Sequence, residues 1–506
     1  MSARLGSTGV GFGYAATPCA SKSCDCMLVA IRYTLHAYCN ITSGRRTPTV
    51  LGYRGRIAGP TQEFGMSIRI GRLPAQDQSN GWSALLPPRR ASAAVQGELD
   101  FDWLVVGAGY AGVAAARQLA RLQPNASIAL VEAGVVGENA SGRNSGFAID
   151  LPHAPGTSEH GTEQGRRAIR VGRFALDELD RLVKAHGIDC GWEKRGRYHV
   201  AVTDEVAKHS LATYEANLRA WQEPYRWVDR NELREALGTA YYGAAIHTPG
   251  TYLVNPASLV RGLADSLPPQ VRLFENSPVI EADICGRTPG VRTPSGRIRA
   301  SALILTVNAF SQSFGVYRAR QIPILLFASL TPALTDTQLG QLGSESTWGV
   351  TPAHGMTGST MRLTREGRLM IRQGFEYSPS LRTTDARRAK ARETHLALLR
   401  RRFPQLGPIE LEHSWAGWLA VSHNHAPAFG RVGPRSFAAS CCNGSGIVRH
   451  TAAGMFIADL AVGQDHSLMA DFLSQGTAGY IPPRPLRDIG VSLALSYGAW
   501  TGRGER

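Results

Sequence analysis

The sequence lacks the features that mark membrane and nucleic-acid-binding proteins. No run of about 18 apolar residues occurs in the 506 residues, so no transmembrane segment is expected. Only 8 cysteines are present, and their spacing matches no standard zinc pattern, so no metal site is expected. Sparse cysteine is typical of reduced thiols and predicts a cytoplasmic protein. Because no basic stripe carries interleaved aromatics, nucleic acid is not an expected partner.

Acidic residues are scarce at the start of the chain. Residues 1–97 hold 11 Lys and Arg against three acids, a net charge of +8, whereas the remaining residues together carry only +7. This first segment also has no clear hydrophobic periodicity. We therefore predict a basic N-terminal extension over residues 1–97, and we expect residues 1–65 to be dispensable, with Met66 as an alternative start.

Glycine, in contrast, is abundant, and three glycines form a recognisable motif. Gly107-Ala108-Gly109-Tyr110-Ala111-Gly112 follows an apolar run, Phe101–Val106, that predicts a buried strand. A helix is expected over 111–122 and a second buried strand over 127–132. Together these segments form a βαβ unit with a G-x-G-x-x-G turn, which is typical of dinucleotide-binding domains.

Each residue type in this motif suits the binding of a dinucleotide. The first glycine permits the turn, the second lets the backbone approach a pyrophosphate, and the third lets the helix pack on the strand. The N–H groups at the helix start attract phosphate. Glu132, which ends the second strand beside Ala133, would accept hydrogen bonds from a ribose diol. The motif by itself does not separate NAD from FAD.

Three further blocks make the sequence similar to a known family. They are the segment ASGRNSGF at 140–147, the segment Ser277-Pro278-Val279 with a strand that ends at Asn308-Ala309, and Pro427–Gly430 followed by Asn443-Gly444-Ser445-Gly446-Ile447 before a helix. With the glycine motif, these blocks resemble the D-amino-acid oxidase-like family of FAD-dependent oxidoreductases, nearest to the branch of glycine/sarcosine oxidases and gamma-glutamylputrescine oxidase. One departure is that the family's SGHG-like end reads SGIV here.

The resemblance implies a fold and a domain organisation. The fold is α/β with an α+β second domain: a Rossmann-like FAD-binding domain with an interleaved, β-sheet-rich substrate domain. The FAD-binding domain would comprise residues 98–190, 246–315 and 414–506, the last with a C-terminal tail. The substrate domain would comprise residues 191–245 and 316–413.

The resemblance also implies the roles of individual residues. FAD would be bound non-covalently, because the segment 413–420, where cysteine-linked relatives carry their cysteine, has none. Arg362 would bind a substrate carboxylate through its planar fork, with Arg365 and Arg372 as competitors. The residues expected to contact the cofactor are Gly107, Ala108, Gly109, Tyr110, Ala111, Gly112, Glu132, Ala133, Ser141, Gly142, Arg143, Asn144, Ser145, Val279, Asn308, Gly430, Gly444, Ser445, Gly446 and Ile447.

The implied activity is oxidation of a C–N bond in an amino acid or amine, by hydride transfer to flavin N5, with O2 or a quinone as the electron acceptor. No residue is singled out as a catalytic acid or base, because the cofactor supplies the chemistry. Two alternatives stay open at this point. One is an NAD-dependent dehydrogenase, and the other is a flavin-binding protein without catalytic activity.

Overall fold

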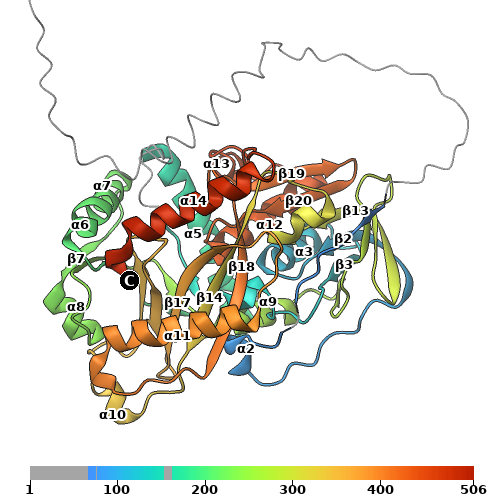
Figure 1. Cartoon of the computed structure of the whole chain (residues 1–506). Coiled ribbons are helices and arrows are strands. Elements are labelled where there is room, and N and C mark those ends of the chain that lie inside the picture. The colour runs from blue at the N-terminus through green and yellow to red at the C-terminus, as the bar shows by residue number, and fades with distance from the viewer. Residues whose placement is uncertain (1–66, 76, 153–161) are drawn as a thin grey trace, which may run out of the picture.

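The computed structural model describes residues 67–75, 77–152 and 162–506, which form two large sheets with helices around them (Figure 1). The prediction that residues 1–65 are dispensable, and four of the eight cysteines, lie outside the described residues. None of the helices in the described part of the chain is both long enough and apolar enough to span a membrane.

The first sheet has nine strands, in the order β1-β11-β12-β13-β2-β3-β10, and β20 pairs with both β13 and β19. The strands β2, β3, β10, β13 and β20 run parallel where they pair, as in a doubly wound fold. The apolar runs of these strands are buried on both faces of the sheet. The bounds are β1 (Ile68–Arg69), β2 (Gly97–Val106), β3 (Ile128–Val131), β10 (Val271–Phe274), β11 (Glu281–Asp283), β12 (Gly290–Arg292), β13 (Gly296–Leu305), β19 (Ala428–Gly433) and β20 (Ser436–Ser440).

Helices pack against this sheet and against one another. The helix α3 follows β2 directly and packs along α12, which also contacts α5. A Cβ on Gly454 of α12 would lie 2.1 Å from the Ala111 carbonyl oxygen, so only glycine allows the two helices to come this close. The bounds are α3 (Tyr110–Leu122), α4 (Ala140–Arg143), α5 (Thr162–Ala185), α9 (Pro256–Asp265), α12 (Gly446–Val462) and α13 (Met469–Phe472).

The second sheet has eight strands, in the order β18-β14-β17-β16-β15-β6-β8-β7, and all its pairs are antiparallel except β15–β6. Its strands come from two separate stretches of chain, 197–248 and 322–421. The bounds are β6 (Arg197–Ala201), β7 (Arg226–Asp229), β8 (Ala244–Thr248), β14 (Ile322–Leu330), β15 (Trp348–Pro352), β16 (Thr360–Leu363), β17 (Leu369–Tyr377) and β18 (His413–Val421).

Further helices surround this second sheet. They are α6 (Asp204–Val206), α7 (Ala212–Trp221), α8 (Arg230–Leu237), α10 (Asp336–Leu339), α11 (Asp385–Arg402) and α14 (Leu486–Thr501). A small sheet, β4 (Phe147–Ala148), β9 (Tyr252–Leu253) and β5 (Glu193–Lys194), joins segments that are distant in sequence. The predicted α/β fold class with a second α+β sheet region is confirmed. The domain boundaries themselves stay a prediction.

The segment 67–97, which the composition assigns to an N-terminal extension, is part of the folded body. Its strand β1 pairs with β11, and its short helix α2 (Gly81–Ala84) contains the fully buried Trp82. The Trp82 indole donates to the Asn144 carbonyl at 2.8 Å, and Arg89 bonds the buried Glu275 at 2.5 Å. These contacts to residues far away in sequence tie residues 67–97 to the folded body, although their low acid content sets them apart in composition.

Two shortened chains test the structural role of residues 67–97. We expect a chain that begins at Met66 to fold and retain FAD, because it keeps α2 and the Trp82 contacts. A chain that begins at residue 98 loses these contacts and is expected to be insoluble or free of flavin. Soluble yield and the flavin absorbance of the purified proteins measure the difference. A flavin-loaded protein from residue 98 would contradict the structural role given to residues 67–97.

Candidate functional site

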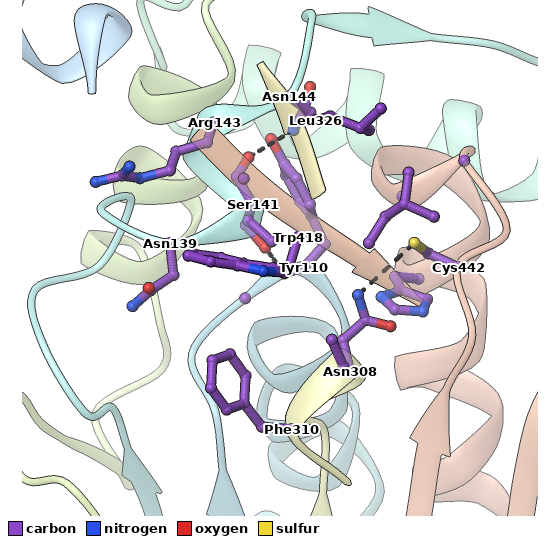
Figure 2. A pocket seen from close by; sticks show the side chains of 18 of the residues that line it. Tyr110, Asn139, Ser141, Arg143, Asn144, Asn308, Phe310, Leu326, Trp418 and Cys442 are labelled. Atoms are coloured by element: carbon purple, nitrogen blue, oxygen red, sulfur yellow. Dashed lines mark hydrogen bonds between the residues drawn. The ribbon is translucent and has the colours of Figure 1, made fainter. Parts of the chain in front are cut away.

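A cavity of about 490 Å³ lies between the two sheets, lined by residues of both. The first sheet contributes the ends of β2 and β3 and the loops that follow them. The second sheet contributes parts of β14, β15, β16, β17 and β18. Figure 2 shows part of this lining, where residues of the glycine turn such as Tyr110 lie near Trp418 and Asn308.

The glycine turn between β2 and α3 forms one end of the cavity. Gly107 has φ of +100°, a conformation that glycine adopts without strain. A Cβ on Gly109 would lie 2.5 Å from the Ser141 hydroxyl, and one on Gly112 would lie 1.7 Å from the Gly107 carbonyl. Gly107 and Gly109 line the cavity, whereas Gly112 serves the packing of the turn and does not. The turn thus leaves open backbone where a phosphate group would be bound.

Glu132 lies just beyond β3, buried at the cavity wall. Its Oε2 accepts the Ala108 N–H at 2.9 Å, and its Oε1 accepts the Asn139 amide at 3.3 Å. Burial raises the pKa of this carboxyl, and the hydrogen bond from Ala108 opposes the rise. Glu132 therefore holds the glycine turn in place, a role that the motif does not show.

The loop after β3 borders the same cavity through Ser141, Asn144 and Ser145. Arg143 also lines it, but its guanidinium binds protein groups: Nε donates to the Glu138 carbonyl at 2.6 Å and Nη1 to the Ala416 carbonyl at 2.9 Å. In Figure 2 this side chain points away from Asn308 and Cys442. Arg143 thus holds the loop against β18.

The N-terminus of α12 forms another wall. Gly444, Gly446 and Ile447 line the cavity, and no side chain caps the helix, although Ser445 occupies the cap position. Asn308 faces the cavity with a buried Oδ1 that has no hydrogen-bond partner. Both α3 and α12 therefore direct the positive ends of their dipoles toward one space. Val279 also lines the cavity, whereas Gly142, Gly430 and Ser445 do not.

Arg362, the predicted substrate ligand, lies outside the cavity lining. Its Nη1 donates to the Val254 carbonyl at 2.6 Å and to the Gly146 carbonyl at 3.1 Å, and its guanidinium lies 5.2 Å from the Trp82 ring. In this structure Arg362 fastens a loop through these two carbonyls, and its role as a substrate ligand stays a prediction. Arg365 pairs with Asp189 and Glu366 at the surface.

Arg372 of β17 is the arginine of this hairpin that does line the cavity. Its Nη2 donates to the Thr360 hydroxyl at 2.5 Å, and its Nη1 is buried with no hydrogen-bond partner. No carboxylate among the described residues forms an ion pair with it. Burial lowers the pKa of Arg372 to about 10. A buried cation without a counter-charge is costly, and an anionic ligand would remove that cost.

Several lining residues carry no motif in the sequence. Trp415 and Trp418 both border the cavity. The residues that sequence reasoning missed include His199 of β6, His450 of α12 and the segment 70–75. For strand residues such as His199, the alternation of side chains along the strand is the only sequence signal that could have placed them at the cavity. No sequence signal placed the segment 70–75 there.

Comparisons with known proteins assign the family. A family model described as FAD dependent oxidoreductase (DAO) matches residues 102–460, and the chain belongs to that family. The chain is 24% identical over 419 residues to the probable oxidoreductase OrdL of Haemophilus influenzae, covering 78% of this chain and 90% of that protein. It is 26% identical over 376 residues to gamma-glutamylputrescine oxidoreductase of Escherichia coli, covering 72% and 84%.

A solved structure shows the same fold. Glycine oxidase from Geobacillus kaustophilus superposes with a TM-score of 0.63 at 20% identity, covering 76% of this chain and all of that one. The protein is thus an FAD-dependent oxidoreductase, and neither NAD nor a role without catalysis is retained. The site agrees with FAD: an open glycine turn, the buried Glu132 carboxylate and a second uncapped helix start lie around one cavity.

Replacing Gly109 with valine is expected to abolish FAD binding. The added Cβ would lie 2.5 Å from the Ser141 hydroxyl, and the branched side chain would fill the space that the pyrophosphate needs. The flavin released by acid from the purified protein measures the loss. Gly490→Val, at an α14 position with open space around its Cβ, is the control and should keep its flavin. Full flavin content in Gly109→Val would contradict the assignment.

Proposed function

We propose that the protein oxidises the C–N bond of an amino acid, or of another amine that carries a carboxylate, with Arg372 as the carboxylate anchor. Arg372, a buried arginine of the cavity wall with which no carboxylate of the described residues forms an ion pair, is the observation that supports this substrate class. When bound, FAD supplies the acceptor for the hydride that leaves the carbon next to nitrogen.

The cavity walls then have separate tasks in this proposal. The planar guanidinium of Arg372, held by Thr360, would pair with both oxygens of a carboxylate and fix the orientation of the substrate. Phe327 and Phe375, which line the same cavity, would exclude water and strengthen that pair. The uncapped N-terminus of α12 would stabilise negative charge that develops on the cofactor.

The names of two relatives agree with this substrate class. Glycine and gamma-glutamylputrescine each carry an amine and a carboxylate, and the corresponding oxidase and oxidoreductase are similar to this chain. The volume of the cavity and its two tryptophans do not select between a small and an extended amino compound. The proposal therefore names the shared chemistry, a carboxylate with a neighbouring or distant amine.

The remaining parts of the proposal concern the cofactor and the acceptor. FAD would be bound without a covalent bond, because β18, where a linking cysteine is expected, has none. The proposed contacts are the cavity-lining residues of the glycine turn, Glu132, the 141–145 loop, Val279, Asn308 and the start of α12. The acceptor would be O2 or a quinone. A cytoplasmic location is proposed from the sparse cysteines, and the four in the described residues are unpaired.

Removing the guanidinium of Arg372 tests the proposal. Arg372→Ala should lower kcat/KM for a carboxylate-bearing amine on the order of 30- to 4000-fold, the cost of losing one partner of a buried charged pair. The same variant should change little for a matched amine without the carboxylate. Arg372→Lys should recover only part of the rate, because an ammonium cannot reproduce the planar fork.

Arg362→Ala serves as the matched control on the same hairpin. It should reduce thermal stability or flavin content without changing the preference for carboxylate over plain amine, because Arg362 binds two backbone carbonyls. If Arg372→Ala slows both substrates equally, Arg372 does not bind the carboxylate. If Arg362→Ala alone removes the preference, the original assignment of Arg362 is restored.

A further inference from the structure

The last long helix, α14, exposes large apolar side chains of the kind that a soluble protein normally buries. Within α14 the structure buries only Gly498. Leu486, Ile489, Leu493 and Trp500 are more than half exposed, at 59%, 55%, 55% and 60%. Figure 1 shows α14 running along the outside of the body. Most large exposed apolar side chains of the described residues lie in this helix or just before it, at Tyr480.

The spacing of these residues forms a stripe. Leu486, Ile489, Leu493 and Trp500 recur at intervals of three, four and seven, which places them on one face of the helix. The stripe extends about 21 Å at the helical rise of 1.5 Å per residue. The exposed Ser496 lies on the same face between Leu493 and Trp500. An exposed apolar stripe of this length is typical of a surface that binds another body.

The charges around the stripe are mostly positive. Arg484 and Arg487 lie at the start of α14, and Arg503 lies just after its end, with its guanidinium 5.6 Å from the Trp500 ring. Asp488, the acid of the helix, is held by Arg484 and by the Tyr377 hydroxyl. Glu505 is buried and accepts the N–H groups of Val202 and Thr203. Arg484 and Arg487 both lie within ion-pair distance of Asp488, whereas no acid of the described residues forms an ion pair with Arg503.

This arrangement of charge disfavours a second copy of the chain as the occupant. Two α14 helices that met face to face would bring arginines together at both ends, whether the helices ran parallel or antiparallel. An anionic phospholipid surface instead offers phosphates to the arginines and hydrocarbon to the leucines and isoleucine. The tryptophan at the end of the stripe suits the boundary between headgroup and acyl chain.

We propose that α14 binds the protein to the surface of an anionic lipid bilayer, with the stripe inserted at the headgroup boundary and the helix lying flat. The helix is packed against the body along its other side, where Tyr377 of β17 bonds Asp488 at 2.7 Å. This inference goes beyond the proposed oxidation and does not depend on it.

The position of α14 links the docking face to the cavity. Met356 lines the cavity, and its Cε would lie 1.7 Å from a Cβ on Gly498, so the side chain packs directly against the helix. A bilayer bound at α14 would therefore lie on the side of the protein where Met356 forms the cavity wall.

Co-sedimentation of the full-length, FAD-loaded protein with lipid vesicles tests the proposal. Vesicles of phosphatidylcholine with phosphatidylglycerol should bind the protein more strongly than phosphatidylcholine alone, and added salt should weaken the binding. The double change Ile489→Asp and Leu493→Asp should lower the partition coefficient at least about tenfold, because two apolar side chains no longer enter the lipid. Arg484→Gln with Arg503→Gln should lower it about fivefold for each charge on anionic vesicles alone.

Trp500→Ser and Trp227→Ser form a matched pair, because Trp227 of β7 is also exposed but lies outside the stripe. The first should weaken binding and the second should not, with flavin absorbance and thermal melting showing that both fold. Three results would overturn the proposal: no vesicle binding by the full chain, equal binding by all variants, or binding only after residues 1–65 are removed. A dimer in sedimentation velocity that Leu493→Asp dissociates would assign the stripe to a second copy instead.

Discussion

The close packing of α3 against α12 is the constraint on which the rest of the site depends. Gly454 lets the two helices approach until a methyl group would lie 2.1 Å from the Ala111 carbonyl. Gln118 of α3 and Asp459 of α12 add a buried hydrogen bond of 2.5 Å between them. Because the helices belong to chain segments more than 300 residues apart, this contact brings two separate N-termini to one cavity. One helix start suits a diphosphate, and the other suits negative charge that develops on a flavin ring.

The second sheet contributes a cation, Arg372, with which no carboxylate of the described residues forms an ion pair. Arg372 bonds Thr360 and lines the cavity. Arg143 pairs with Asp77 and bonds the Ala416 carbonyl, and Arg362 bonds the Val254 carbonyl, so both fasten the loops around the cavity. Leaving one buried guanidinium without an anion lowers the stability of the folded protein. Binding of a carboxylate, as proposed, would recover that free energy. Of the three arginines near the cavity, two therefore hold loops in place, and the third is the proposed ligand of the substrate.

Much of the first sheet was predictable, because its signals are local. The glycine turn needs three particular residues within six positions, and Glu132 follows from the length of a βαβ unit. The choice between Arg362 and Arg372 was not predictable in this way. Both lie in strands of one hairpin, where Thr360 pairs with Arg372 and Arg362 with Met370. Thr360 and Arg362 are two residues apart, so their side chains lie on the same face of the sheet. The loop at Gly146 covers Arg362 on this face and leaves Arg372 at the cavity. The packing of residues 67–97 against the body was not predictable for a related reason. These residues contact segments that are distant in sequence, and their own hydrophobic pattern is irregular.

The most direct test of this account is anaerobic mixing of the purified, flavin-loaded protein with single amino compounds, followed by flavin absorbance. The panel comprises amino acids, N-methyl amino acids, gamma-glutamyl amines and the corresponding amines without a carboxylate. The account predicts that at least one carboxylate-bearing amine bleaches the oxidised flavin band, and that its carboxylate-free counterpart bleaches it far more slowly. A flavin that stays oxidised with every compound, or that responds equally well with and without the carboxylate, would contradict it.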